Sequence, residues 1–231
     1  MNPPYTSEFI FFQATAFAGD LPRLPTSLRE FDCSFSLISG GLTEANFAGL
    51  NDMNFALLDG NAYNSTVPNV FGSLQSLQFL YLSDSFVSGD LSYMQGMPAI
   101  VEHWIDLNPG VTGTIPEFIG SLNTLASFSV TQSNLVGPIP ASIGNLGNMV
   151  QLWFYGNKLS GNIPSTLGQL NRMNTLQLED NDFVGSMPVE ICNNVGFLRP
   201  LTILGADCGD AGFTCDCCTC CSIMQCNPEL F

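Results

Sequence analysis

Glycine recurs about every twenty-four residues in this chain, and the same phrase surrounds it in three consecutive places. The phrases are Gly113–Leu122 (GTIPEFIGSL), Gly137–Leu146 (GPIPASIGNL) and Gly161–Leu170 (GNIPSTLGQL). A fixed period of this length is typical of a solenoid, in which each unit buries its apolar face only against its neighbours. The period therefore decides the architecture before any other feature is considered. It predicts a long binding surface but does not identify a ligand.

Within one unit, each kind of residue predicts a separate structural role. Leu152 and Phe154 alternate with residues that face solvent, which is the pattern of a strand with one buried side. Asn157 ends the strand, where a short amide can bond to the backbone of the adjacent coil. The pair Ile163-Pro164 then starts a short helical turn, because the fixed φ of proline suits a first helical position.

This combination resembles the plant-type leucine-rich repeat, and the resemblance extends from about residue 10 to residue 198. It implies an α/β solenoid: a right-handed superhelix of short parallel strands with 3-10 or irregular segments on the convex side. The phrases Phe31–Phe47, Glu102–Gly110 and Gly205–Cys208, with the motif Cys215–Cys221, also resemble the leucine-rich repeat proteins of diatoms. The wider plant-type family includes receptor ectodomains and inhibitors of cell-wall hydrolases, which bind peptides, glycans or proteins on the inner curve. The resemblance therefore implies a fold and a binding role.

The repeat divides the chain into two predicted segments. Residues 1–198 form the repeat array, with about seven to eight coils, and residues 199–231 form a Cys-rich C-terminal cap or tail. The array opens in the middle of a repeat, since Ile10 and Phe12 fall where Leu152 and Phe154 fall in the later unit. We therefore expect the sequence to be a fragment that lacks the N-terminal cap of the array.

Adding twenty-four to each strand position predicts which side chains line the concave face. Exposed aromatic residues on such a face signal stacking on sugars or anchoring in a partner. The alternative is that they cover one another along the ladder of strands. The predicted ligand-binding residues are Phe79, Tyr81, His103, Ile105, Trp153, Tyr155, Gln177 and Glu179.

One coil departs from this counting. Between Glu102 and Asn108 the count places Trp104 and Asp106 on inward positions, and burying an aspartate without partners is costly. A one-residue bulge that turns Ile105 and Leu107 inward would avoid that cost. An irregularity of this sort accompanies a binding site or only a repacking of one coil.

The nine cysteines are concentrated at the C-terminal end of the chain. Dense cysteine in a short tail is typical of disulfides formed in an oxidising compartment, with a thiolate metal site as the alternative. A Cys192–Cys208 pair would cap the last coil, and this pairing resembles the caps of other extracellular repeat proteins. Cys33 is left over, either buried as a small apolar residue or paired with a region upstream. The predicted disulfide cysteines are Cys192, Cys208, Cys215, Cys217, Cys218, Cys220, Cys221 and Cys226.

Two further features bear on location and partners. The sequon Asn64-Ser65-Thr66 predicts an N-glycan at Asn64, and beside the cysteines it favours an extracellular or cell-surface protein. A net charge of −15 argues against nucleic acid and anionic membranes. The acidity either keeps the surface soluble or suits a cationic or calcium-bearing partner. No apolar run approaches the roughly eighteen residues that span a bilayer.

The sequence contains no recognisable catalytic constellation. Its single histidine, His103, has no predicted nucleophile within reach, and the glycines mark coils rather than a phosphate loop. We therefore expect a non-catalytic module, without cofactor or metal, that recognises a protein, peptide or glycan on its concave face. The alternative is a structural or adhesive component of a cell covering, cross-linked through the Cys-rich tail. Ice binding, which has precedent among plant-type repeats, requires a flat polar face, and the mixed aromatic columns speak against it.

Overall fold

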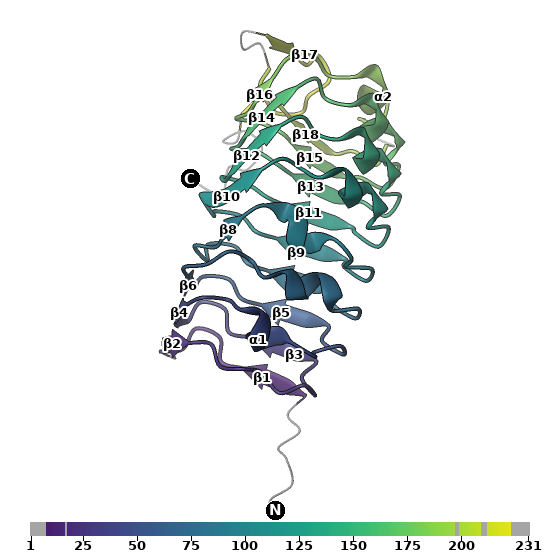
Figure 1. Cartoon of the computed structure of the whole chain (residues 1–231). Helices are drawn as coiled ribbons and strands as arrows, with labels where there is room; N and C mark the ends of the chain where they lie inside the picture. Colours follow the sequence, from purple (N-terminus) through teal and green to yellow (C-terminus); the bar gives the residue numbers. More distant parts are fainter. Residues whose placement is uncertain (1–7, 17, 197–198, 209–211, 223–231) are drawn as a thin grey trace, which may run out of the picture.

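The computed structural model describes residues 8–16, 18–196, 199–208 and 212–222, and these residues form a rod of stacked coils (Figure 1). One side of the rod is a parallel sheet of nine strands, each hydrogen-bonded to the strand of the next coil. Its order is β1 (Phe9–Phe11), β3 (Glu30–Asp32), β5 (Phe55–Leu57), β7 (Phe79–Tyr81), β9 (Glu102–Trp104), β11 (Ser127–Ser129), β13 (Gln151–Trp153), β15 (Thr175–Gln177) and β18 (Ile203–Gly205). The chain is therefore a leucine-rich repeat solenoid, as predicted. We call the outer surface of this sheet the concave face.

The return half of each coil forms shorter parallel sheets and single helical turns. The sheets are β2 (Ala18–Asp20), β4 (Leu37–Gly40) and β6 (Ala62–Tyr63); β8 (Ser88–Gly89), β10 (Gly110–Gly113), β12 (Asn134–Gly137), β14 (Lys158–Gly161) and β16 (Asp182–Phe183); and β17 (Gly185–Ser186) with β19 (Phe213–Thr214). The turns are α1 (Glu44–Phe47), η1 (Asn69–Ser73), η2 (Leu91–Met94), η3 (Glu117–Ser121), η4 (Ala141–Asn145), η5 (Ser165–Gln169) and α2 (Val189–Cys192). Proline stands one residue before most of these turns, as Pro140 does before η4, and not at the predicted first helical position.

The core lies between the sheets and follows the predicted pattern. Leu152 and Phe154 are fully buried, and each buried side chain of this size stabilises the fold by roughly 1.5–3 kcal/mol. Asn157 joins neighbouring coils, because its Nδ2 donates to Val130 O at 2.7 Å while its Oδ1 accepts from Leu135 N at 3.0 Å. The predicted role of the asparagine is therefore confirmed.

The coil that carries β9 has a different length from its neighbours. Regular strands pair at an interval of twenty-four residues, as Ser127 does with Gln151. Glu102 pairs with Phe79, which is twenty-three residues before it (102 − 79), and with Ser127, which is twenty-five residues after it (127 − 102). The half-coil before Glu102 is one residue shorter, and Pro109 adds one residue after the strand. The two changes cancel, so the later coils keep their register.

This change of register corrects two predicted positions. His103 and Ile105 were expected on the concave face, but both are fully buried in the core. Trp104 and Asp106 take the outward positions instead. The one-residue bulge considered from the sequence would turn Ile105 and Leu107 inward. It is correct for Ile105 and wrong for Leu107, which is 47 % exposed.

Disulfides close the C-terminal end, but in a different pairing from the predicted one. Among the described residues the bonds are Cys192–Cys217, Cys208–Cys221 and Cys215–Cys218, so the predicted Cys192–Cys208 pair is wrong. The pairing differs because the tail folds back and adds parallel strand pairing at the end of the array. Gly205 is bridged to Cys220, and β17 is paired with β19. Cys226 lies outside the described residues. Cys33 is a free, buried thiol whose sulfur lies 3.3 Å from the Tyr63 hydroxyl, and burial raises its pKa to about 12.

The predicted division between residues 198 and 199 stays a prediction, and β18 lies beyond it as the last strand of the nine-stranded sheet. Within the residues described, no helix has the length and apolar character that crossing a bilayer requires.

Candidate ligand-binding face

Aromatic side chains form a continuous group at the middle of the concave face. Tyr81 of β7 and Trp104 of β9 are adjacent in register, and their rings stack with centroids 4.6 Å apart and planes 6° from parallel. Trp153 of β13 meets Trp104 edge to face at 6.2 Å, across the small side chain of Ser129. The rings of Phe79 and Phe55 stack face to face, with centroids 4.4 Å apart and planes 5° from parallel. These rings are partly exposed, so they cover one another in part and still present apolar surface to solvent.

Hydrogen bonds fix the orientation of two of these rings. The Tyr81 hydroxyl donates to Glu102 Oε2 at 2.7 Å, and Trp104 Nε1 donates to Ser127 Oγ at 3.0 Å. Burial raises the pKa of Tyr81, so its hydroxyl keeps the proton that it donates. The polar edges of both rings are occupied and one face of each ring covers the other, so the contact surface is the apolar part that stays exposed.

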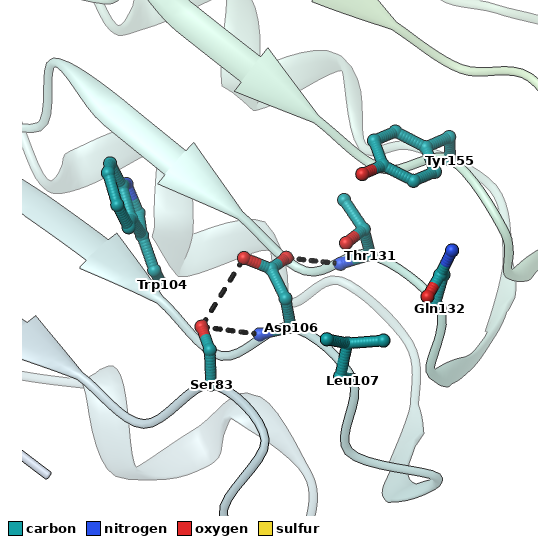
Figure 2. A pocket seen from close by; sticks show the side chains of 7 residues that line it. All are labelled: Ser83, Trp104, Asp106, Leu107, Thr131, Gln132 and Tyr155. Atoms are coloured by element: carbon teal, nitrogen blue, oxygen red, sulfur yellow. Dashed lines mark hydrogen bonds between the residues drawn. The ribbon is translucent and has the colours of Figure 1, made fainter. Parts of the chain in front are cut away.

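A pocket of about 390 Å³ opens beside Trp104 and draws its walls from four successive coils. Its lining residues are Ser83, Trp104, Asp106, Leu107, Thr131, Gln132 and Tyr155. Figure 2 shows the Asp106 carboxyl between Ser83 and Thr131, with Trp104 and Tyr155 on either side of it.

The Asp106 carboxyl is held by donors from the two neighbouring coils. Its Oδ1 accepts from Ser129 Oγ at 2.6 Å and from the Thr131 backbone N at 2.7 Å. Its Oδ2 lies 3.4 Å from Ser83 Oγ, which in turn accepts from the Asp106 backbone N at 3.2 Å. These bonds fix the carboxyl on the pocket wall with one oxygen well bonded and the other weakly bonded.

The surroundings of this carboxyl are acidic. Asp59 Oδ1 accepts from the Ser83 backbone N at 2.7 Å, so two carboxyls flank the same serine. Burial raises the pKa of Asp106, and burial, with the nearby charge of Asp106, raises the pKa of Asp59 to about 6. In the part of the chain that the structure describes, the outward positions of the nine strands carry no lysine or arginine.

The structure separates the predicted ligand-binding residues into three groups. Phe79, Tyr81, Trp153 and Tyr155 lie on the concave face and are partly exposed. His103 lies in the core, where its Nδ1 bonds to Leu80 O at 2.8 Å and its Nε2 to the Tyr93 hydroxyl. Burial lowers the pKa of His103 to about 4, so the ring is neutral and inaccessible to a ligand. Ile105 is buried beside it.

Gln177 and Glu179 take outward positions, as predicted, but they are buried rather than exposed. The sulfur of Cys220 in the tail lies 3.9 Å from Glu179 Oε1, so the tail covers this end of the face. Burial raises the pKa of Glu179 to about 7. These two residues are therefore inaccessible to a ligand on the concave face.

Trp104 and Asp106 are the residues that the constant period failed to place. The asparagine that joins neighbouring coils shows where each strand begins. Asn157 follows the start of its strand by six residues (157 − 151), and Asn108 follows Glu102 by the same number (108 − 102). Counting back from each asparagine gives the observed register.

Comparison with known proteins supports the repeat fold. Residues 148–170 match the family described as Leucine Rich Repeat. No curated protein sequence matches the chain closely enough to count as a relative.

Three solved structures are similar over most of the chain. A TDR receptor has 22% sequence identity to this chain and a TM-score of 0.78. The match covers 86% of this chain and 35% of the receptor chain. A second structure is the ectodomain of the plant membrane receptor kinase GASSHO1/SCHENGEN3 from Arabidopsis thaliana, in complex with CASPARIAN STRIP INTEGRITY FACTOR 2. It has 26% identity and a TM-score of 0.76, and the match covers 88% of this chain and 23% of the receptor chain. The plant peptide hormone receptor RGFR1, in complex with RGF2, has 24% identity and a TM-score of 0.70, covering 80% and 34%. The chain therefore spans about a third or less of the length of these receptors.

Proposed function

We propose that this chain is a non-catalytic binding module that holds a peptide, or an extended segment of a protein, against its concave face. The observation that carries this proposal is the partly exposed aromatic group of Tyr81, Trp104 and Trp153 beside an open pocket. Large aromatic residues at the centre of a surface are the residue types that contribute most to protein recognition. The neutral, buried state of His103 leaves this face without a histidine base.

The geometry of the sheet favours an extended ligand. Neighbouring strands of a sheet lie roughly 4.8 Å apart, so the coils from β7 to β13 present side chains at regular steps along the rod. A peptide that crosses these coils would meet Tyr81, Trp104 and Trp153 in turn. The receptor ectodomain of GASSHO1/SCHENGEN3, which is 26% identical over 88% of this chain, also forms a complex with a named factor.

Other parts of the prediction belong to this proposal. An extracellular or cell-surface location fits the disulfides and the receptor neighbours. An N-glycan at Asn64 fits its exposed position. A glycan ligand and the resemblance to diatom proteins remain predictions. Because six of the cysteines that the structure describes pair with one another, the alternative of a component cross-linked through its tail has less support.

Selection of peptides from a random display library on the immobilised protein tests the proposal. We expect selected peptides to bind the wild type and to lose about tenfold or more in affinity on Trp153→Ala, with the midpoint of unfolding almost unchanged. Val136→Ala is the matched control, because Val136 is 41% exposed on the opposite sheet in β12. Peptides that bind Trp153→Ala as well as wild type, or that respond to Val136→Ala instead, would contradict the proposal.

A further inference from the structure

Resting on the proposed function, we propose that the pocket between Trp104 and Tyr155 is a subsite for a basic side chain of the bound peptide, with arginine preferred. The pocket combines aromatic walls, a fixed carboxyl and an acidic surrounding surface. Each of these features selects a cationic group for a different physical reason.

The aromatic walls suit a planar cation. Trp104 and Tyr155 both line the pocket, and a guanidinium group gains attraction from the face of such rings. Arginine is also more weakly hydrated than lysine and stacks on aromatic surfaces, so it loses less on entering. Leu107 adds an apolar wall for the aliphatic part of the side chain.

The carboxyl of Asp106 supplies the acceptor. Donors from Ser129 and Thr131 occupy Oδ1 at 2.6 and 2.7 Å, whereas Oδ2 has the longer 3.4 Å contact with Ser83 Oγ. A carboxylate oxygen accepts at two lone-pair sites, so Oδ2 retains capacity for a further donor. Burial disfavours the charged form of this carboxyl, and a bound cation restores it, which makes the pocket respond to charge rather than to shape alone.

The charge of the whole face favours a cation over a neutral sugar. Glu102 lies in the same coil as Asp106, Asp59 accepts from the backbone N of the pocket residue Ser83, and the chain carries a net charge of −15. Such a field raises the local concentration of cations. A sugar hydroxyl could donate to Oδ2, but it would gain nothing from the surrounding charge.

Two synthetic pentapeptides test the inference directly: acetyl-Gly-Gly-Arg-Gly-Gly-amide and the same peptide with citrulline, the neutral isostere of arginine. The chain has two tryptophans, and both lie on the concave face, so tryptophan fluorescence reports binding. We expect the arginine peptide to bind about tenfold or more tightly than the citrulline peptide, as loss of a charged hydrogen bond implies. Asp106→Asn should remove that preference.

Asp182→Asn is the matched control, because it removes the same charge from an exposed position in β16 on the opposite sheet. It should leave the preference for arginine intact. If Asp106→Asn fails to fold, Tyr155→Leu tests the same pocket from its exposed wall and should lower the affinity for the arginine peptide several-fold.

The outcomes separate this inference from the proposed function. Equal binding of the two pentapeptides, or an unchanged preference on Asp106→Asn, would overturn the basic subsite. Binding of laminarihexaose that Asp106→Asn abolishes, without binding of the arginine peptide, would assign the pocket to a sugar. Display-selected peptides that need Trp153, lack basic residues and ignore Asp106→Asn would sustain the proposed function while refuting the subsite.

Discussion

The coil around β9 and the regular coil around β13 have the same architecture but present different chemistry. In the regular coil, Leu152 and Phe154 point inward, and Trp153 and Tyr155 point outward. In the coil of β9, a histidine and Ile105 take the inward positions. The irregular coil also contributes Trp104 and Asp106 to the pocket.

The difference originates in the connections and not in the strand itself. Glu102 follows Gly89 by thirteen positions (102 − 89), whereas Gln151 follows Gly137 by fourteen positions (151 − 137). Because side chains alternate along a strand, a shift of one residue exchanges every inward and outward side chain. The Asp106 carboxyl, which would be costly in the core, is thereby placed on a surface where donors of Ser83, Ser129 and Thr131 lie near it.

The largest expected effect is the loss of stability when Ile105, an inward residue of the irregular coil, is truncated. Ile105→Ala should lower the free energy of unfolding by about 2–5 kcal/mol, because the side chain is fully buried. Leu107→Ala, two residues further on and exposed, should change it by about 0.5 kcal/mol or less. Equilibrium denaturation in guanidinium chloride measures both. A small effect at Ile105 would restore the register of the constant period.

A second prediction uses pH to sharpen the contrast between His103 and its apolar counterpart Leu152. His103 is neutral when folded, with a pKa of about 4 against its usual value near 6.5. The unfolded chain therefore binds more protons in this range, and the stability due to the neutral ring is present above pH 6.5 and is lost as the pH falls towards 4. Between pH 7 and pH 4, the wild type should lose about 3 kcal/mol relative to His103→Leu.

This pH effect is measured as a difference between the two proteins, because Glu179 and Asp59 titrate in both. Their raised pKa values act in the opposite direction and cancel in the comparison. Parallel curves of stability against pH for the wild type and His103→Leu would contradict the assignment of His103 to the core.

The smallest expected effect concerns the residue that follows the outward strand positions. Leu107 has a φ of +58°, and the matching residue of the regular coil, Gly156, has a φ of +69°. A left-handed conformation costs an ordinary residue about 1–2 kcal/mol, and asparagine tolerates it better. Leu107→Asn should therefore raise the melting temperature, by an amount that corresponds to about 1 kcal/mol or less. Gly156→Ala should lower the melting temperature. A lower melting temperature for Leu107→Asn, or a higher one for Gly156→Ala, would refute the explanation.

The sequence predicted the solenoid and the regular core because both depend on local repetition. Leu152 and Phe154 could be placed since their neighbours repeat the same phrase. Trp104 and Asp106 were misplaced because a constant interval assumes constant connection lengths, and the position of Asn108, together with the cost of an inward Asp106, shows that this assumption fails. The burial of Glu179 depends on the fold of a distant tail, and cysteine pairing is not determined by spacing.

The pocket takes its walls from four successive coils, from Ser83 in the first to Tyr155 in the fourth. In a one-dimensional array, each coil is stabilised only by the coils directly beside it, so the rod bends wherever one such interface yields. A ligand seated in the pocket would link the first of these coils to the fourth. Occupancy would then make the middle of the rod stiffer, and the spring-like compliance between its two ends would fall.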